Sequence, residues 1–305
     1  MSTMRIGSFE IQRVLEWVGP IKTVGEMFPD TADEAWTEDL APHHWTPSTG
    51  AYRAAIQTWV LREGGRTILI DTGVGNDRAR PQAPAFDHLD TDFLQRLARL
   101  GVDPAEVDVV VNTHIHYDHV GWNTRLDGTN WVPTFPNATY LVPQRDYDYF
   151  NPENAGSMRA ARTEDEERRF AGARLVFADS ITPIVEAGHL QTWDGEHRID
   201  DALRLESAPG HTPGSSVAWL ETGAGAVFVG DLMHTPVQIA HPDDPCAFDL
   251  DPEAASASRR QVLSAAARAG ATVFPAHFAG HGAASVSAHD AANFRVDKWA
   301  DFTAV

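Results

Sequence analysis

The sequence is short of several residue types, and each shortage excludes a class of protein. Cys246 is the only cysteine among 305 residues, so the chain contains no internal disulfide and no thiolate metal cluster. A single cysteine is typical of a reducing compartment, which predicts a cytoplasmic protein. No apolar run reaches the roughly 18 to 20 residues of a membrane-spanning helix. Residues 1–10 have neither the basic nor the apolar part of a signal peptide.

Basic residues are also scarce. The formal net charge is −19, and the only lysines are Lys22 and Lys298. A protein that binds nucleic acid needs a basic face to displace counterions from phosphates, and adsorption to an anionic membrane needs the same. We therefore predict neither nucleic acid nor a membrane as partner, and expect a small organic molecule instead. The 14 histidines, in contrast, need an explanation.

Short apolar, β-branched runs alternate with helical patterns. The runs have the length of strands and end at Gly, Pro, Asp or Asn; they cover residues 55–61, 67–70, 107–111, 138–142, 202–207, 216–220, 226–229 and 272–274. A helix is predicted over residues 93–100, ending at Gly101. Another begins after the N-cap Asp251 and ends before Gly270. The charged segment 159–170 predicts a solvated helix face. This alternation predicts an α/β protein with sheets covered by helices, rather than two separate domains.

Residues 1–50 differ from the rest of the chain. They contain one predicted strand, residues 5–16, followed by a segment rich in Pro, Asp, Glu and Trp with weak periodicity. We predict a single domain over residues 1–305, with residues 1–50 as its N-terminal extension. Three interpretations of this extension stay open: a surface segment that covers part of the core, a flap over the active site, or the contact of a homodimer.

The most informative segment, residues 114–119, reads His-Ile-His-Tyr-Asp-His and follows the predicted strand 107–111. Three imidazoles and a carboxylate within six residues converge on a metal only in a tight turn at the end of a strand. Imidazole and carboxylate without thiolate favour zinc, with manganese, iron and cobalt as alternatives. A histidine-rich turn without metal is the competing interpretation, and so dense a cluster of ligand-type residues disfavours it.

Three later segments each place a ligand-type residue after a predicted strand. His211 lies in the turn Pro-Gly-His-Thr-Pro-Gly that follows residues 202–207. Asp231 lies in the dipeptide Gly-Asp that follows residues 226–229, and His277 comes shortly after residues 272–274. Each signal is weak alone, because Gly-Asp after a strand is commonly a turn. Their order behind the histidine-rich segment makes them informative together.

With these residues in this order, the sequence resembles the metallo-β-lactamase superfamily over roughly residues 55–277. The resemblance implies a four-layer αββα sandwich with two divalent metal ions between its two sheets. It also implies the ligands: His114, His116 and His211 for the first metal, Asp118, His119 and His277 for the second, and Asp231 as the bridge between them. Residues 68–73, Ile-Leu-Ile-Asp-Thr-Gly, match a strand of the family, which implies that Asp71 orients a ligand histidine from behind.

Departures from several branches of the superfamily narrow the function. β-Lactamases usually lack a counterpart of Asp231 and bind the substrate carboxylate through a lysine, and diiron redox members usually have Glu where this chain has His116. RNA-processing members have further motifs, and glyoxalase-II-like thioesterases use basic residues near the C-terminus. Lactonases, arylesterases and phosphotriesterases remain. Residues 230–238, Gly-Asp-x-x-His-x-x-x-Gln, resemble the methyl-parathion-hydrolase branch. This likeness implies that His234 either polarises the substrate oxygen or packs beside the site.

The predicted function is hydrolysis of lactones or other uncharged esters by a hydroxide held between the two metal ions. Asp118 is expected to move the proton as well as to bind metal. The alternatives are an organophosphate triesterase or a thioesterase on the same site and, less favoured, a metal-dependent redox enzyme of the same fold. Residues next to the ligands in sequence are expected to line the substrate pocket: Trp122, Asn123, Met233 and Phe278.

The expectation of an uncharged substrate comes from the scarcity of cations. Enzymes that bind a carboxylate usually place a lysine or arginine near the reacting centre, and neither lysine is close in sequence to a predicted ligand. The segments 107–123 and 208–245 contain no arginine. Three arginines are left as candidates to reach the site from elsewhere in the chain: Arg80, Arg125 and Arg145.

Overall fold

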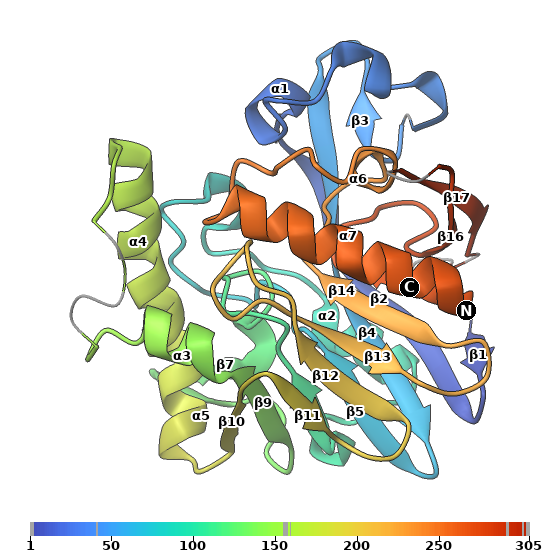
Figure 1. Cartoon of the computed structure of the whole chain (residues 1–305). Coiled ribbons are helices and arrows are strands. Elements are labelled where there is room, and N and C mark those ends of the chain that lie inside the picture. The colour runs from blue at the N-terminus through green and yellow to red at the C-terminus, as the bar shows by residue number, and fades with distance from the viewer. Residues whose placement is uncertain are drawn as a thin grey trace.

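The structure, a computed structural model, describes residues 3–40, 42–154, 158, 160–290, 293–300 and 302. Two large sheets pack face to face (Figure 1). In hydrogen-bonded order the first contains β1 (Met4–Ile6), β2 (Phe9–Thr23), β4 (Ala51–Glu63), β5 (Arg66–Ile70), β6 (Val109–Val111), β9 (Thr139–Pro143) and β10 (Leu190–Trp193), with β3 (Trp45–Thr46) paired to β4. The second contains β11 (Glu196–Arg198), β12 (Leu203–Ser207), β13 (Ser216–Leu220), β14 (Ala226–Gly230), β15 (Thr272–Pro275), β16 (Ala284–Ala288) and β17 (Phe294–Trp299). A separate hairpin contains β7 (Thr124–Asp127) and β8 (Asn130–Pro133).

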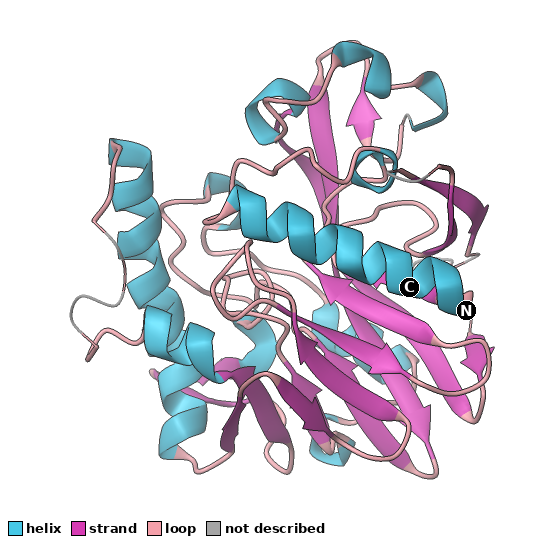
Figure 2. Ribbon diagram, viewed as in Figure 1, coloured by secondary structure: helices cyan, strands magenta, loops and turns pink. Residues whose placement is uncertain are grey.

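Helices cover the outer faces of both sheets (Figure 2). On the first sheet α2 (Phe93–Arg99) buries Phe93 and Leu97, and on the second α7 (Pro252–Ala269) buries Val262 and Leu263. The other α-helices are α1 (Val24–Met27), α3 (Gln144–Phe150), α4 (Glu164–Val176), α5 (Thr182–Glu186) and α6 (Val237–Ala240). Shorter turns are the π-helical η6 (Phe177–Ile181) and the 3-10 helices η1 (Asp33–Ala35), η2 (Glu38–Leu40), η3 (Pro84–Phe86), η4 (Pro104–Glu106) and η5 (Gly121–Asn123). The layers form the αββα sandwich that the resemblance implies.

Alternation of side chains along the central strands explains why the sheets are covered on both faces. In β4, Trp59 and Leu61 pack between the two sheets, whereas Val60 packs against the helices outside. In β14, Phe228 faces the other sheet and Val227 faces α7. Because successive residues of a strand point to opposite faces, an unbroken apolar run supplies both layers of the core.

The two helices with clear capping signals form as predicted. The side chain of Asp251 accepts a hydrogen bond from Ala254 N at 3.0 Å at the start of α7, and Gly270 ends that helix with φ +66°. Gly101 follows α2 with φ +73°. Only glycine adopts this left-handed conformation without steric cost, so these two positions fix where the helices stop.

The N-terminal segment differs from its prediction. Residues 5–16, expected as one strand, form a hairpin in which Gly7 turns the chain with φ +58° between β1 and β2. β2 then pairs with β4 along most of its length, so residues 9–23 are an integral strand of the first sheet. The part of residues 1–50 beyond β2 therefore starts at α1, and within it β3 pairs with β4 of the first sheet. Whether it forms a dimer contact stays a prediction.

α4 also differs from the solvated helix expected over residues 159–170. It begins at Glu164, after the N-cap Thr163, whose hydroxyl accepts a hydrogen bond from Glu166 N at 3.1 Å, and it runs to Val176. Arg159 lies outside the described residues. One face of α4 lines the cavity described below, a role that the expectation of a solvated helix face did not include.

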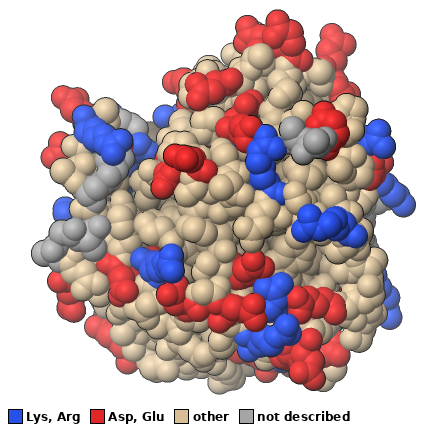
Figure 3. Space-filling view, viewed as in Figure 1, with Lys and Arg blue, Asp and Glu red and all other residues tan. Residues whose placement is uncertain are grey.

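The loops that follow β5, β6, β12, β14 and β15 meet at one edge of the sandwich, because β5 runs parallel to β6 and β14 runs parallel to β15. On the face shown in Figure 3, basic side chains are scattered among acidic ones rather than gathered in one patch. Within the described part of the chain, every helix falls short of the length and apolar character needed to cross a bilayer.

Candidate metal centre

The loop after β6 holds four of the predicted ligands in one tight turn. Asn112 Nδ2 donates a hydrogen bond to the carbonyl of His119 at 3.1 Å, and His119 N donates to the carbonyl of His116 at 3.1 Å. Ile115 N donates to the carboxylate of Asp146, a fully buried residue of α3, at 2.8 Å. These bonds fix the backbone so that the ligand side chains of the turn point to a common centre.

Asp146 joins this loop to the loop that carries His211. Its carboxylate also accepts hydrogen bonds from Thr212 Oγ1 at 2.9 Å and from Gly214 N at 2.5 Å. Burial raises the pKa of Asp146 to about 6, although these hydrogen bonds act against the shift. Sequence reasoning missed this residue, because an aspartate in the first turn of a helix is ordinarily explained by the helix dipole alone.

Asp231, directly after β14, lies at the centre of the cluster, and its two carboxylate oxygens face different histidines. Oδ1 lies 3.1 Å from His119 Nε2 and 2.9 Å from His277 Nε2. Oδ2 lies 3.2 Å from His211 Nε2 and 3.7 Å from His114 Nε2. The carboxylate thus stands between two groups of imidazoles, with one oxygen toward each group.

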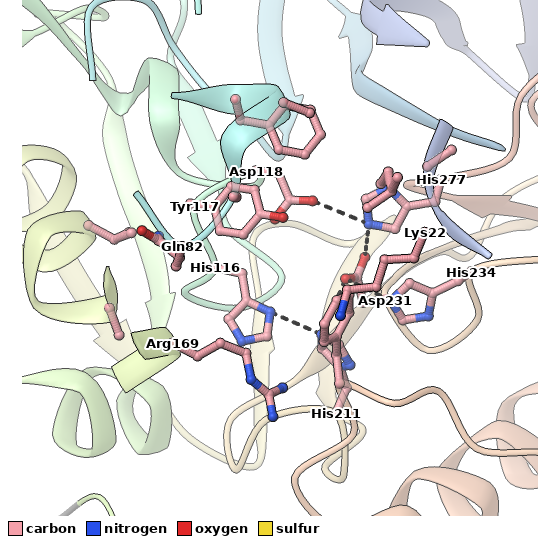
Figure 4. A pocket seen from close by; sticks show the side chains of 18 of the residues that line it. Lys22, Gln82, His116, Tyr117, Asp118, Arg169, His211, Asp231, His234 and His277 are labelled. Carbon is pink, nitrogen blue, oxygen red and sulfur yellow. Dashed lines mark hydrogen bonds and ion pairs between the residues drawn. The ribbon is translucent and has the colours of Figure 1, made fainter. Parts of the chain in front are cut away.

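The remaining predicted ligands complete these groups. His116 Nδ1 lies 3.0 Å from the Nε2 atoms of both His114 and His211. Asp118 Oδ2 lies 3.6 Å from His277 Nε2, and Figure 4 shows these side chains converging. All seven predicted ligands come together in two groups whose candidate ligand atoms lie within 4.8 Å of one another: His114, His116, His211 and Asp231 in one, and Asp118, His119 and His277 in the other.

The donor set fits metal ions. His119 Nε2 and Asp231 Oδ1 are buried and lie 3.1 Å apart, but neither atom makes a hydrogen bond of suitable geometry within the described part of the chain. Buried polar atoms are almost always hydrogen-bonded, so two such atoms without a hydrogen bond are typical of side chains that share a cation. Imidazole nitrogens and carboxylate oxygens without thiolate are donors that zinc accepts. The residues present therefore fit divalent metal ions.

Both histidines of the second group have a hydrogen-bond partner at Nδ1, the ring nitrogen that faces away from the cluster. His277 Nδ1 lies 2.8 Å from the carbonyl of Ala55, and His119 Nδ1 lies 2.8 Å from Asp71 Oδ2. Asp71 follows β5 with φ +56°, a conformation uncommon outside glycine, and it also accepts a hydrogen bond from Thr113 N at 2.8 Å. A histidine that donates through Nδ1 presents a deprotonated Nε2, which is the atom that binds metal.

In the first group, His211 has a similar partner that sequence reasoning missed. Its Nδ1 lies 3.0 Å from Oδ1 of Asp249, in the segment between α6 and α7. The local sequence Cys-Ala-Phe-Asp-Leu-Asp contains two aspartates, and only Asp251 gave a signal there, as the N-cap of a helix. Nothing in that sequence pairs Asp249 with a histidine 38 residues away.

The charges of the cluster shift the pKa values of its members. Burial raises the pKa of Asp231, but the surrounding histidines, His119 foremost, hold it well below its usual value. Burial lowers the pKa of His211, but hydrogen bonds to two aspartates outweigh it and raise this pKa to about 9. For His114 and His116 burial prevails, and their pKa values lie well below the usual range. The site therefore favours positive charge close to Asp231.

His234 lies on the same side of the cluster as His211. Its Nε2 is 3.2 Å from Asp231 Oδ2 and 3.8 Å from Cys246 Sγ, and its ring stacks on His277 with the centroids 5.2 Å apart. His234 N donates a hydrogen bond to Gln238 Oε1 at 2.8 Å. Within the Gly-Asp-x-x-His-x-x-x-Gln segment, the Gln238 side chain thus fixes the backbone of His234, and the His234 side chain contacts Asp231.

A cavity of about 330 Å³ opens beside the cluster. His116, Asp118, His211, Asp231, His234 and His277 form its polar wall. Most other lining side chains are apolar and come from the end of β2, α1, η3, α3, α4 and the segment before α7: Ile21, Met27, Phe86, Phe150, Phe170, Val176, Phe248 and Leu250. An apolar cavity with a few convergent polar groups is the usual form of a site for a small organic molecule.

The four residues expected to line this cavity do not line it. Trp122 is a core residue whose Nε1 donates to Glu16 Oε1 at 2.7 Å, and Asn123 is hydrogen-bonded within the buried network behind the ligand loop. Met233 and Phe278 pack in the core between the second sheet and α7. Adjacency in sequence misled here, because consecutive residues of a turn point in different directions.

Two basic side chains do line the cavity, contrary to expectation. Lys22 at the end of β2 and Arg169 of α4 are among the lining side chains labelled in Figure 4. Each lies 5.6 Å from the centroid of the Phe248 ring. The expectation that no lysine lies near the site is therefore wrong. The arginines considered from the sequence are absent from the lining: Arg80, Arg125 and Arg145.

The chain is similar to known proteins of one family. A family model described as the metallo-beta-lactamase superfamily matches residues 52–277. N-acyl homoserine lactonase AttM of Azorhizobium caulinodans is 32% identical over 129 residues, 41% of this chain and 40% of that protein. AttM of Rhizobium johnstonii is 40% identical over 135 residues, 43% of this chain and 42% of that protein. Ribonuclease Z of Mycobacterium avium is 26% identical over 192 residues, 62% and 60% of the two chains. The chain thus spans about two fifths of the length of the lactonases that it matches.

Solved structures share the fold over nearly the whole chain. The hydrolase AbOPH of the beta lactamase superfamily has a TM-score of 0.80 at 24% identity and covers 99% of this chain and 97% of its own. AidC, described as a dizinc quorum-quenching lactonase, has a TM-score of 0.75 at 21% identity and covers 97% and 96%. At such identities the likeness establishes the fold, and it confirms the predicted αββα sandwich.

Proposed function

Because this chain belongs to the metallo-beta-lactamase superfamily, we propose that it is a dinuclear metal-dependent hydrolase of lactones or other uncharged esters. The observation that carries the proposal is the position of Asp231, whose two oxygens face two separate groups of ligand side chains. Relatives named N-acyl homoserine lactonase support an ester bond as the target. Ribonuclease Z is also a relative, but a net charge of −19 disfavours an RNA substrate.

The side chains of the site have different roles in the proposed hydrolysis. Two divalent metal ions would supply an activated water as nucleophile and a Lewis acid for the carbonyl oxygen of the substrate. His114, His116, His211 and Asp231 would hold the first ion, and Asp118, His119, His277 and Asp231 would hold the second. Asp118 lies on the cavity wall with 10% of its side chain exposed. It can therefore take the proton of the reacting group while it remains a ligand.

For His234 the geometry favours the positioning role over direct contact with the substrate oxygen. Its Nε2 is directed at Asp231, and its Nδ1 is buried. A histidine held in this way keeps the bridging carboxylate turned toward both groups of ligands. Its side chain still borders the cavity, so a substrate can pack against the ring.

A screen of metal-replete protein tests the proposed function. Lactones, aryl esters, thioesters, β-lactams and phosphotriesters are compared by kcat/KM, and lactones or aryl esters are expected to rank first. Phosphotriesters or thioesters in first place would support the corresponding alternative. A protein that isolates with iron and consumes dioxygen would support the redox alternative. No hydrolysis of any class with both metals bound would overturn the proposal.

We predict two metal ions per chain in the active protein. The two groups of ligands, joined by Asp231, provide for this stoichiometry. Elemental analysis of protein dialysed after loading with zinc should find close to two equivalents, and activity should rise with the second equivalent. A firm stoichiometry of one with full activity would contradict the dinuclear mechanism.

We predict that a neutral ester is hydrolysed faster than a matched ester with a carboxylate near the scissile bond. Asp118 and the overall negative charge of the protein repel an anion, and the cavity wall is mainly apolar. The difference in kcat/KM should narrow as salt screens the charges. Lys22 and Arg169 are the cavity-lining cations that would reverse this order, so Lys22→Met and Arg169→Met are measured in parallel. A preference for the carboxylate that either substitution abolishes would contradict the prediction and identify that residue as an anchor for anions.

A further inference from the structure

Asp249 is a buried carboxylate that has no part in the mechanism proposed above. It lies between α6 and α7, and its side chain is 0% exposed. Oδ1 lies 3.0 Å from His211 Nδ1, whereas His211 Nε2 faces Asp231 on the other side of the ring. Asp249 is absent from the cavity lining, so its contact with the metal centre runs through His211.

The other oxygen of Asp249 is held by the loop and by α7. Oδ2 accepts a hydrogen bond from Cys246 N at 2.9 Å and lies 3.6 Å from Arg259 Nη2. Arg259 is fully buried and donates to the carbonyls of Leu232 and Pro242, each at 2.7 Å. The guanidinium therefore ties together the loop after β14 and the loop before α7, and it compensates the charge of Asp249.

Asp71 has the same relation to the second group of ligands. Its Oδ2 lies 2.8 Å from His119 Nδ1, and its side chain is also buried. Asp71 lies in the loop after β5, 48 residues from His119 in the sequence. Asp249 lies in the segment between α6 and α7, 38 residues from His211. Each group of ligands thus contains one histidine that is backed by a buried aspartate.

We propose that Asp249 is a positioning residue for the first metal ion: it holds His211 with Nε2 toward the metal, as Asp71 holds His119 toward the second, and Arg259 keeps it in place. The inference rests on the proposed metal centre but not on the identity of the substrate. A carboxylate that accepts Nδ1–H fixes the tautomer and raises the basicity of the ligand atom. Loss of such a partner typically weakens metal binding by about 10–100-fold.

Asp249→Asn removes this role with little change in volume. Asp249 faces two donors, His211 Nδ1–H and Cys246 N–H. An asparagine has one acceptor oxygen and one donor NH₂ group, so one of these two donors meets the NH₂ group whichever way the amide turns. When the NH₂ group faces His211, Nδ1 has to accept, and the ring proton moves to Nε2, where it blocks the metal.

The test is the stepwise zinc affinity of the full-length protein, measured by competition with a chromophoric chelator. In Asp249→Asn one of the two equivalents should bind about 10–100-fold more weakly, and the other with nearly wild-type affinity. The absorption spectrum of the Co²⁺-loaded protein should change as well. Asp251→Asn is the matched control, since it makes the same substitution at a helix N-cap, where asparagine serves as well as aspartate. It should leave both affinities and the spectrum unchanged.

Two outcomes would overturn the proposal. The first is wild-type affinity for both equivalents with an unchanged Co²⁺ spectrum. The second is equal weakening of both equivalents together with a lower melting temperature of the metal-free protein, which indicates a purely structural role. If Asp249→Asn does not fold, the smaller Asp249→Ser must show the same loss at one site. No substrate is needed, so wild-type protein that binds two zinc ions but hydrolyses no ester would refute the proposed function alone.

Discussion

Asp231→Asn is expected to fold but to lose both metal ions and most of its activity. The two oxygens of Asp231 face the two groups of ligands separately, and asparagine keeps only one of them while it turns an NH₂ group toward the other group. An NH₂ group cannot bind a cation. Metal ions stabilise the transition state by several kcal/mol, and each 1.36 kcal/mol or so is a factor of ten. We therefore expect kcat/KM to fall about 1,000-fold.

The measurement combines kcat/KM with the metal content of the same sample. Asp243→Asn is the control, because Asp243 is an exposed aspartate whose partner is Arg260 on the outer side of α7. It should keep both metals and wild-type activity. An Asp231→Asn protein that retains two equivalents of metal would show that Asp231 does not bridge.

Acid is expected to remove activity, by about a factor of ten per pH unit below about pH 7. Water activated by a metal ion has a pKa near 7, so protonation below this pH removes the nucleophile. The five ligand histidines also have to be neutral to bind metal, and protons displace the metal as the pH falls. Both effects have the same sign: activity is high above pH 7 and is lost on acidification.

Measurement of bound metal beside kcat/KM between pH 5 and pH 9 separates the two causes. A fall in rate with both metals still bound assigns the transition to the nucleophile, whereas a parallel loss of metal assigns it to the histidines. Activity that stays flat down to about pH 5 with metal retained contradicts an activated water as nucleophile, given its expected pKa near 7.

Local patterns predicted the central layers of the fold. The runs at residues 55–61, 67–70, 216–220 and 226–229 became β4, β5, β13 and β14, with bounds that differ most at β4. Those runs form strands because β-branched and apolar side chains suit both faces of a buried sheet. The start and the end of α7 were also predicted from local sequence, because Asp251 caps its first turn and Gly270 ends it in a left-handed conformation.

Elements at the margin of the sandwich were predicted less well. The turn at Gly7 went unrecognised because apolar residues continue on both sides of it, so the hairpin was expected as one strand. For α4 the charged residues of the pattern predicted a solvated face and gave no sign of a role at the cavity. Arg169 and Phe170 line the cavity, because the tertiary structure places this helix beside it.

The sequence by itself predicted the seven candidate ligands, because residues of ligand type follow several strands and their order resembles the ligand pattern of a known family. Their order and spacing also identified the family. Only the tertiary structure decided which oxygen of Asp231 faces which histidines, that Asp146 and Asp249 stand behind the ligand loops, and that Lys22 reaches the cavity. The physical reason is distance along the chain: a contact such as that between Asp249 and His211 depends on how whole loops and helices pack, which leaves no local pattern in either segment.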